Sequence, residues 1–269
     1  MTSDRDKPEV ANDDKKKVAV KKKPRRRLSR QQQRRRSLIR AGLTGFAILV
    51  LQPIANWPLA RRAYARLRPP GSLDEETFLG ACIKCGQCVQ VCPVNAITFA
   101  DINEGFGSGA PYIDARAQAC DFSCDALSCI LACPTGALSH ELHSKEEVAI
   151  GVARLSRPDA CLARSAQGFH GTTRGSDFRG RIRDEAVDRW NAIPISEHPY
   201  DREICDLCVI ECPIGETAIR LEMLVNADVA GAMTPVVGDG CVGCGVCQMV
   251  CPEEPTCIVV DPFGEEART

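Results

Sequence analysis

The chain has 269 residues, of which 17 are cysteine and only 13 are aromatic. So few aromatic side chains exclude a large aromatic-rich core along the whole length. Residues 1–40 hold 16 Lys/Arg against 5 Asp/Glu, whereas residues 41–269 hold 18 against 30, a formal net charge of −12. This acidic body argues against a nucleic-acid partner, because proteins that bind phosphate backbones present a basic surface.

The first 65 residues are predicted to be a disordered basic extension followed by a twin-arginine signal with its h-region. Residues 1–36 are rich in Lys and Arg and lack an apolar period, so they cannot form a core. Arg35–Arg40, with the sequence RRSLIR, resembles a twin-arginine export signal. The uncharged residues 41–60 contain two prolines, which favours a signal h-region over a spanning helix. Ala63–Ala65 (AYA) then matches a signal-peptidase site.

This signal predicts a periplasmic protein that the twin-arginine translocase exports. The alternative is a basic tail that binds anionic lipid or nucleic acid, but the order of basic, apolar and A-x-A segments favours export. The sequence leaves open whether the signal is cleaved after Ala65 or retained as an anchor, which would attach the protein to the periplasmic face of the cytoplasmic membrane.

Fifteen cysteines fall into four motifs that each end in Cys-Pro: residues 82–93, 120–134, 205–213 and 241–252. The first and fourth have the bacterial ferredoxin spacing C-x2-C-x2-C-x3-C-P, in which three thiolates wrap one iron–sulfur cluster and the last reaches its neighbour. The second motif is looser, C-x3-C-x4-C-x3-C-P. The third lacks its first cysteine, and Cys161 is the candidate for the missing thiolate. The sequence therefore predicts four [4Fe-4S] clusters.

The motifs repeat as two pairs, which predicts the fold. The last cysteines of motifs one and two are 41 residues apart, those of motifs three and four are 39 apart, and each Cys-Pro leads into a short apolar run typical of an edge strand. We expect an α+β protein with tandem ferredoxin-like dicluster units, whose short strands and helices are organised around the clusters. The predicted domains are residues 1–65, a first unit at 66–143, an insertion or linker at 144–204 that contributes Cys161, and a second unit at 205–269.

Crossed ligation is expected within each unit, because the last cysteine of one motif completes the cluster of the other. In the first unit, one cluster takes Cys82, Cys85, Cys88 and Cys133, and the other takes Cys92, Cys120, Cys124 and Cys129. In the second unit, one takes Cys161, Cys205, Cys208 and Cys251, and the other takes Cys212, Cys241, Cys244 and Cys247. A nested pairing, one with four and two with three, remains open and would change only the membership of Cys92, Cys133, Cys212 and Cys251.

Zinc and disulfides are the alternatives to iron–sulfur clusters. Zinc takes four tetrahedral ligands and gives no reason for a third cysteine and a recurring Cys-Pro in each motif. Disulfides suit an exported protein, but C-x2-C-x2-C packs thiols too densely for pairwise bridges. Cys257, the remaining cysteine, is predicted to be a small apolar strand residue, and it is also the alternative to Cys161 as a ligand of the third cluster.

Little outside the motifs indicates chemistry. The chain has no phosphate-binding glycine loop, no dinucleotide fingerprint and no C-x-x-C-H haem motif, so we expect an electron carrier without its own substrate site and not an enzyme. Residues 170–190 balance 5 Arg against 4 Asp/Glu and are predicted to be a solvated loop, which includes Arg174, Arg179, Arg181 and Arg183. The histidines lack metal-site spacing and are predicted to lie on the surface: His140, His143, His170 and His198.

The twin-arginine run, the segment Arg68–Gly71 (RPPG) and a third motif that takes a ligand from upstream together resemble the NapG/MauM family of ferredoxin-type proteins, over most of residues 35–262. The resemblance implies a periplasmic or membrane-attached carrier of four [4Fe-4S] clusters. Its partners would be a membrane-bound quinol-oxidising Fe-S protein and a periplasmic cytochrome or reductase, in nitrate reduction in one branch and in methylamine oxidation in another. The spacing of motif two, the long basic extension and the enlarged insertion at residues 162–204 depart from the family pattern, which leaves the branch open.

Three functions compete on this basis. The leading hypothesis is a relay of electrons through four clusters between the membrane quinol-oxidising partner and a periplasmic redox system. The second is a permanent electron-transfer subunit of a molybdenum-type oxidoreductase. The third is a redox assembly factor for a periplasmic enzyme, of the methylamine-utilisation type.

Overall fold

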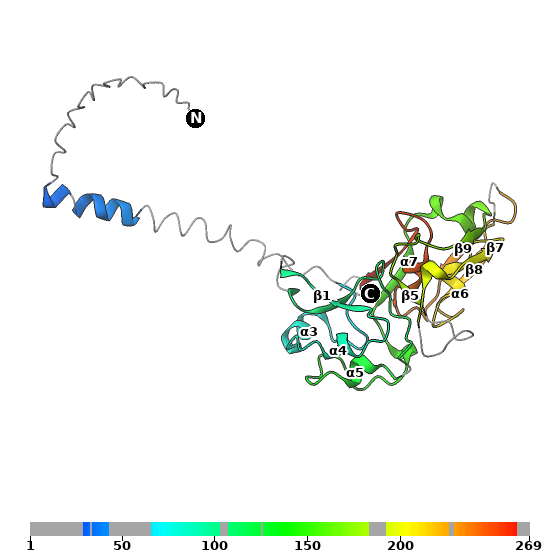
Figure 1. Ribbon diagram of the computed structural model, residues 1–269, viewed down its shortest axis with the longest axis horizontal. Coiled ribbons are helices and arrows are strands. Elements are labelled where there is room, and N and C mark those ends of the chain that lie inside the picture. Colours follow the sequence, from blue (N-terminus) through cyan, green and yellow to red (C-terminus); the bar gives the residue numbers. More distant parts are fainter. Residues whose placement is uncertain are drawn as a thin grey trace, which may run out of the picture. The chain divides into compact units, whose positions relative to one another are not determined.

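A computed structural model describes residues 29–32, 34–42, 66–102, 107–124, 126–182, 192–225 and 229–262 (Figure 1). The chain divides into two compact units, Met1–Ala55 and Asn56–Thr269. In the first unit, residues 30–32 and 34–42 are helical and their side chains are exposed, including those of Arg35–Arg40. The predicted cleavage site, residues 1–28 and most of the h-region lie outside the described residues. Among the residues that are described, no helix has both the length and the apolar character needed to cross a membrane.

The second unit consists of short helices and two-stranded antiparallel sheets. The α-helices are α3 (Glu75–Ala81), α4 (Gln87–Gln90), α5 (Ser128–Leu131), α6 (Leu207–Ile210) and α7 (Val246–Val250), and the 3-10 helices are η2 (Lys145–Glu147), η3 (Pro158–Ala160), η4 (Leu162–Ser165) and η5 (Ile195–Glu197). The paired strands are β1 (Ile97–Phe99) with β2 (Pro111–Ile113), β3 (Gly151–Leu155) with β10 (Ile258–Pro262), β4 (Phe169–Gly171) with β7 (Tyr200–Arg202), β5 (Arg181–Ile182) with β6 (Ile193–Pro194), and β8 (Ile219–Met223) with β9 (Met233–Val237). This mixed content of helix and strand agrees with the α+β class.

Each cysteine motif forms one short helix that carries its third cysteine. These helices are α4, α5, α6 and α7, with Cys88, Cys129, Cys208 and Cys247, and the last cysteine of each motif lies just beyond the helix. The helix α7 begins after Gly245, whose φ of 93° is left-handed, and a Cβ there would lie 2.5 Å from the Cβ of Ala115. Only glycine therefore fits this turn, because it tolerates positive φ and has no side chain to clash.

The apolar runs after Cys-Pro form the expected short strands in three of the four repeats, as β1, β8 and β10. In the remaining repeat Leu138 makes only an isolated bridge to Ser72. The two halves of this unit correspond, because β1 with β2 resembles β8 with β9, and the Ser72–Leu138 bridge resembles the ladder of β3 with β10. The predicted linker at residues 144–204 thus contains β3, a strand that completes the last repeat.

The core is built mainly from small side chains and cysteines. Few large side chains are fully buried, among them Phe78, Ile130, Leu207 and Met249. Arg68 is also buried, where its guanidinium pairs with Glu75 and donates to the carbonyl oxygen of Pro111 at 2.8 Å. A core this poor in large apolar groups agrees with the composition.

Candidate iron–sulfur sites

Cys82, Cys85, Cys88 and Cys133 line one pocket, and we call them the first quartet. Three belong to motif one, and Cys133 arrives from motif two through the turn after α5. Cys88 is buried and Cys85 is exposed, whereas the other two are half-buried. The first quartet thus presents one thiol to solvent.

Cys92, Cys120, Cys124 and Cys129 form the second quartet. The thiol groups of Cys92, Cys124 and Cys129 lie close enough that the charge of one raises the pKa of another. Burial is the main cause that raises the pKa of Cys120, and the charges of Cys244, in another quartet, and of Cys129 add to it. Cys92 also accepts a hydrogen bond at Sγ from the N–H of Ala96, at 3.3 Å. The structure therefore exchanges the last cysteines between motifs one and two.

Cys161, Cys205, Cys208 and Cys251 form the third quartet and line a pocket that Cys257 also borders. Cys161 is buried at the junction of η3 and η4, far in sequence from motif three. The pairing of β4 with β7 closes this gap, because the two ends of that hairpin return side by side. Next to it, the N–H of Cys205 donates to the carbonyl oxygen of Gln167 at 3.0 Å.

Gly168 allows this close return of the chain. A Cβ at residue 168 would lie 2.1 Å from the carbonyl oxygen of Arg202 and 2.7 Å from that of Glu203. No side chain fits at such distances, so the hairpin that places Cys161 beside motif three depends on a glycine here.

Cys212, Cys241, Cys244 and Cys247 form the fourth quartet and line a further pocket. Cys244 and Cys247 are buried, and the other two are half-buried. The last cysteine, Cys212, comes from motif three. All sixteen predicted cysteines thus lie in four groups of four thiols, arranged as the adjacent pairing of motifs describes.

The quartets suit iron–sulfur clusters better than single metal ions. A [4Fe-4S] cluster takes four cysteine thiolates, which is the donor set of each quartet. Within the described part of the chain, no three His, Cys, Asp or Glu side chains converge closely enough to hold one metal ion. The chemistry of the donors therefore fits the larger group that the motif spacing indicates.

Burial raises the pKa of thiols in every quartet. Burial first, and neighbouring thiolates second, raise the pKa of Cys88 to about 11 and that of Cys129 to about 12. Burial is also the main cause that raises the pKa of Cys205 and Cys244 to about 12. Because the thiolate is the form that binds metal, a bound cluster would supply the positive charge that these thiols need to lose their protons, and its binding would release those protons.

Cys133 differs from the other quartet thiols. Burial raises its pKa, but the N–H groups of Leu138, Thr135 and Ala137 donate to the sulfur and lower the pKa overall. His140 lies beside it, with Nε2 at 3.0 Å from the carbonyl oxygen of Cys133. This thiol therefore forms a thiolate more readily than its buried neighbours.

Within each pair of motifs, the two quartets lie next to each other. The charge of Cys88, in the first quartet, reaches Cys129 in the second and raises its pKa. In the same way Cys208, in the third quartet, raises the pKa of Cys247 in the fourth. Each motif pair therefore brings eight thiols into one neighbourhood.

The second and fourth quartets meet at a junction between motifs two and four. The N–H of Cys120 donates to the carbonyl oxygen of Cys244 at 3.1 Å. Arg116, whose side chain is 17% exposed, anchors the same junction. Its guanidinium donates to the carbonyl oxygens of Gln248 (2.7 Å), Cys251 (2.9 Å) and Glu253 (2.9 Å) and to Oε2 of Glu254 (2.7 Å). The four quartets therefore adjoin in the order first, second, fourth, third.

The insertion also packs onto this junction. Arg174 donates to the carbonyl oxygen of Arg116 at 2.8 Å, and its guanidinium lies 4.1 Å from the ring centroid of Phe178. The prediction of a solvated loop is therefore wrong for Arg174, because its side chain is only 18% exposed. Arg179 and Arg181 are exposed as expected, and Arg183 lies outside the described residues.

The histidines take no part in the quartets. His140, His143 and His170 are exposed, as predicted for surface residues. His198 is half-buried instead, because its ring packs edge-on against Tyr200 at 4.9 Å between centroids.

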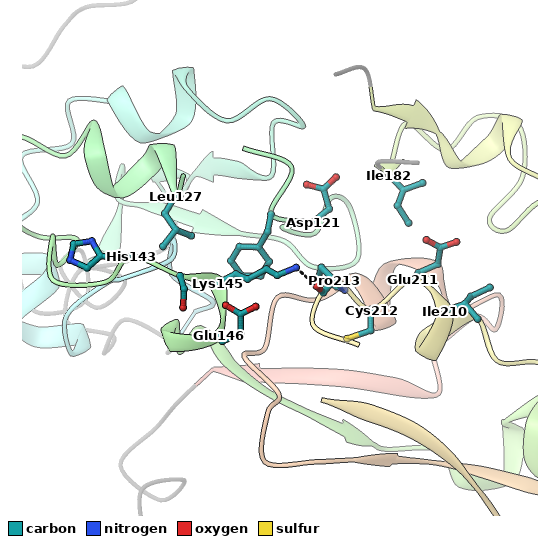
Figure 2. A pocket seen from close by; sticks show the side chains of 12 residues that line it. Asp121, Leu127, His143, Lys145, Glu146, Ile182, Ile210, Glu211, Cys212 and Pro213 are labelled. Carbon is teal, nitrogen blue, oxygen red and sulfur yellow. Dashed lines mark hydrogen bonds between the residues drawn. The ribbon is translucent and has the colours of Figure 1, made fainter. Parts of the chain in front are cut away.

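A polar cavity of about 580 Å³ borders the junction between the two motif pairs (Figure 2). Lys145 reaches across it and donates from Nζ to the carbonyl oxygen of Pro213 at 2.5 Å. Asp121, Glu146 and Glu211 also line the cavity, beside Cys212 of the fourth quartet. Acidic groups thus predominate where solvent approaches the middle of the row of quartets.

Sequence reasoning missed Arg116 and the hairpin that brings in Cys161. Arg116 is one of many arginines, and no local pattern signals that it caps carbonyl groups more than a hundred residues away. The position of Cys257 could be predicted from the sequence, because each of the other Cys-Pro segments has alanine immediately before its apolar run, at Ala96, Ala137 and Ala218.

Comparison with known proteins places these sites in a family. A family model of the 4Fe-4S dicluster domain matches residues 81–137, and one of the 4Fe-4S binding domain matches residues 238–258. These matches cover motifs one and two and motif four. No solved structure gives a significant match.

Curated relatives match most of the chain. The ferredoxin-type protein NapG of Escherichia coli is 34% identical over 208 residues, which cover 76% of this chain and 74% of the relative. The methylamine utilization ferredoxin-type protein MauM of Methylorubrum extorquens is 32% identical over 78% of this chain and 79% of its own. NapG of Haemophilus influenzae is 33% identical over 82% of this chain and 67% of its own. The chain therefore belongs to the NapG/MauM family of ferredoxin-type proteins, electron carriers with 4Fe-4S domains.

Proposed function

We propose that this chain is a periplasmic electron relay that holds four [4Fe-4S] clusters and connects a membrane-bound quinol-oxidising Fe-S protein to a periplasmic cytochrome or reductase. The observation that carries the proposal is the gathering of sixteen cysteines into four quartets, three of which surround a pocket. The family relation and the two 4Fe-4S domain models support the same cofactor.

Each quartet would hold one cluster through its four thiolates. When bound, such a cluster accepts and releases one electron at a time. The protein prepares at least two of the ligand sulfurs with backbone donors, since Cys92 accepts from the N–H of Ala96 at 3.3 Å and Cys251 from the N–H of Cys257 at 3.4 Å. These donors stabilise the thiolate form and fix the direction in which each sulfur points.

The order of the quartets supports two ends for the relay, and the exposure of Cys85 leaves the first quartet open to a partner. Cys85 is exposed, so a partner can approach the first quartet closely, whereas Cys244 and Cys247 are buried in the interior of the row. Since the quartets adjoin in the order first, second, fourth, third, the first and third quartets are the two ends. We propose that partners exchange electrons at these ends.

Export by the twin-arginine translocase is part of the proposal. It rests on the RRSLIR sequence of Arg35–Arg40 and on the need to export a folded protein with its clusters in place. Replacing Arg35 and Arg36 by lysine is expected to leave the full-length protein inside the cell, as cell fractionation would measure. Unchanged export of this variant would overturn the assignment.

The branch of the family decides the terminal partner. The MauM relatives are named for methylamine utilization, and the family resemblance adds nitrate reduction as the other system. The same plan could serve a stable subunit of a large reductase. Purification of the chain from its own membranes distinguishes them, because a stoichiometric complex with a large catalytic subunit contradicts a freely exchanging relay.

The decisive experiment is metal analysis of the anaerobically purified chain. We expect about sixteen irons and as many sulfides per chain, with little zinc, because a cubane cluster holds four of each. A redox titration followed by electron paramagnetic resonance (EPR) should then resolve four clusters. Iron near zero, or zinc in its place, would contradict the proposal.

A further inference from the structure

Cys257 occupies a position that is alanine in the other three repeats. Each Cys-Pro segment is followed by a buried small residue and then by the first apolar residue of the next run: Ala96-Ile97, Ala137-Leu138, Ala218-Ile219 and Cys257-Ile258. The backbone at this position has the same role in two repeats, since the N–H of Ala96 donates to Sγ of Cys92 and the N–H of Cys257 donates to Sγ of Cys251. Only the thiol of Cys257 is additional.

The side chain of Cys257 faces the third quartet. It is 3% exposed and borders the same pocket as Cys161, Cys205, Cys208 and Cys251. The N–H of Cys257 donates to Sγ of Cys251 at 3.4 Å, and its thiol is near enough to Cys251 and Cys161 to interact with both electrostatically. The sulfur of Cys251 therefore lies beside both the N–H and the thiol of Cys257.

The geometry of the repeats argues against Cys257 as a ligand. The third quartet already has four thiols, which is the number that a cubane cluster takes. Cys205, Cys208 and Cys251 take the second, third and last places of a motif, and Cys161 takes the first place that motif three lacks. In the first, second and third repeats, by contrast, the residue at the position of Cys257 is alanine, which cannot bind iron.

We propose that Cys257 tunes the third cluster as a hydrogen-bond donor to its ligand, with its S–H directed at Sγ of Cys251. This inference rests on the proposed function. A donor at a ligand sulfur stabilises negative charge on the cluster, and the reduced cluster carries one more negative charge, so the donor raises the reduction potential. The third cluster alone has such a thiol donor at its last ligand, because the equivalent residues Ala96, Ala137 and Ala218 have none.

The first test replaces Cys257 by alanine, which restores the residue of the other repeats and keeps the backbone donor. We expect the full iron content, four clusters in the EPR-monitored redox titration, and one midpoint potential shifted to lower values while three stay unchanged. Cys257→Ser, which keeps a donor of similar size, should leave that potential closer to the original. An unchanged set of four potentials in Cys257→Ala would overturn the inference, and loss of about four irons would show a ligand instead.

The second test introduces the thiol elsewhere. Ala96→Cys places the same group beside Cys92 in the second quartet, where the N–H donor is already present. We expect one other midpoint potential to rise, with iron content unchanged. If the iron content falls, Cys257→Ala still decides the matter by itself.

These measurements separate the inference from the proposed function. An original chain without iron would contradict the relay. If the original chain holds four clusters and their midpoint potentials are the same in Cys257→Ala, only the role of Cys257 is contradicted.

Discussion

The two motif pairs differ in how their cysteines are assembled. Motifs one and two lie within residues 66–143, and all eight cysteines of their two quartets come from that stretch. Motifs three and four depend on distant segments, because Cys161 and β3 come from residues 151–161. A repeat with one cysteine displaced upstream can therefore form the same kind of quartet, provided that tertiary contacts hold the displaced segment.

The pairs also differ in exposure. The first quartet has one exposed thiol, Cys85, whereas the fourth quartet has the buried thiols Cys244 and Cys247 and shares the junction with the second. Loss of the fourth site should therefore disturb both pairs, and loss of the first should stay local.

The largest expected effect is a loss of stability at high pH in the iron-free protein. Burial, the main cause, raises the pKa of Cys205 and Cys244 to about 12, and it also raises the pKa of Cys208 and Cys247. In iron-free protein the unfolded chain then loses these protons at lower pH than the folded chain, so the stability present below pH about 9 declines as pH rises towards 12. Urea unfolding of the iron-free chain between pH 7 and 11 measures this, and a flat or rising stability would contradict it.

A single change in the fourth quartet should disturb more than one in the first. We expect Cys244→Ser to remove the fourth cluster and to weaken the junction, because the loop that this cluster would hold carries the carbonyl oxygen that accepts the N–H of Cys120. Cys85→Ser, at the exposed end, should affect only the first cluster. The iron content and thermal unfolding midpoint of both variants test this prediction. Equal destabilisation would contradict the difference between the fourth quartet, inside the row, and the first quartet, at its end.

Cys161→Ser should have a smaller and more local effect. We expect it to alter or remove the third cluster and to leave three clusters in the redox titration, because the other quartets do not use this residue. Cys257→Ala is the matched control and should keep all four. If Cys161→Ser kept four unchanged clusters, the ligand assignment in the third quartet would be wrong.

Arg116→Gln should have the smallest effect on cofactor content and a clear effect on stability. The change leaves largely buried carbonyl groups of Gln248 and Cys251 without their donor, which costs about 3 kcal/mol in the free energy of unfolding. Arg154→Gln is the control, because Arg154 pairs with Asp261 on the surface and its side chain is 58% exposed. Equal unfolding midpoints for the two variants would show that Arg116 does not hold the junction.

The sequence by itself determined the parts of the protein that depend on local spacing. Three cysteines within seven residues and a proline after the last one indicate a cluster loop wherever they occur, so motifs one and four were predictable without any tertiary contact. The short strands after Cys-Pro were predictable for the same reason, since their apolar runs are continuous with the motifs. The two 4Fe-4S family models and the NapG relative agree with this prediction from local spacing.

Only the tertiary structure decided which distant segments meet. The nested pairing was open from sequence, because the same motifs can exchange their last cysteines either way, and the structure places Cys133 with motif one and Cys251 with motif three. No sequence pattern in the 43 residues between Cys161 and Cys205 predicts that these two cysteines lie together. The β4–β7 ladder, the close approach at Gly168 and the Arg116 junction decide it. Such contacts depend on how a long loop closes, and the entropy of closure changes so little with loop length that sequence spacing carries no signal of the outcome.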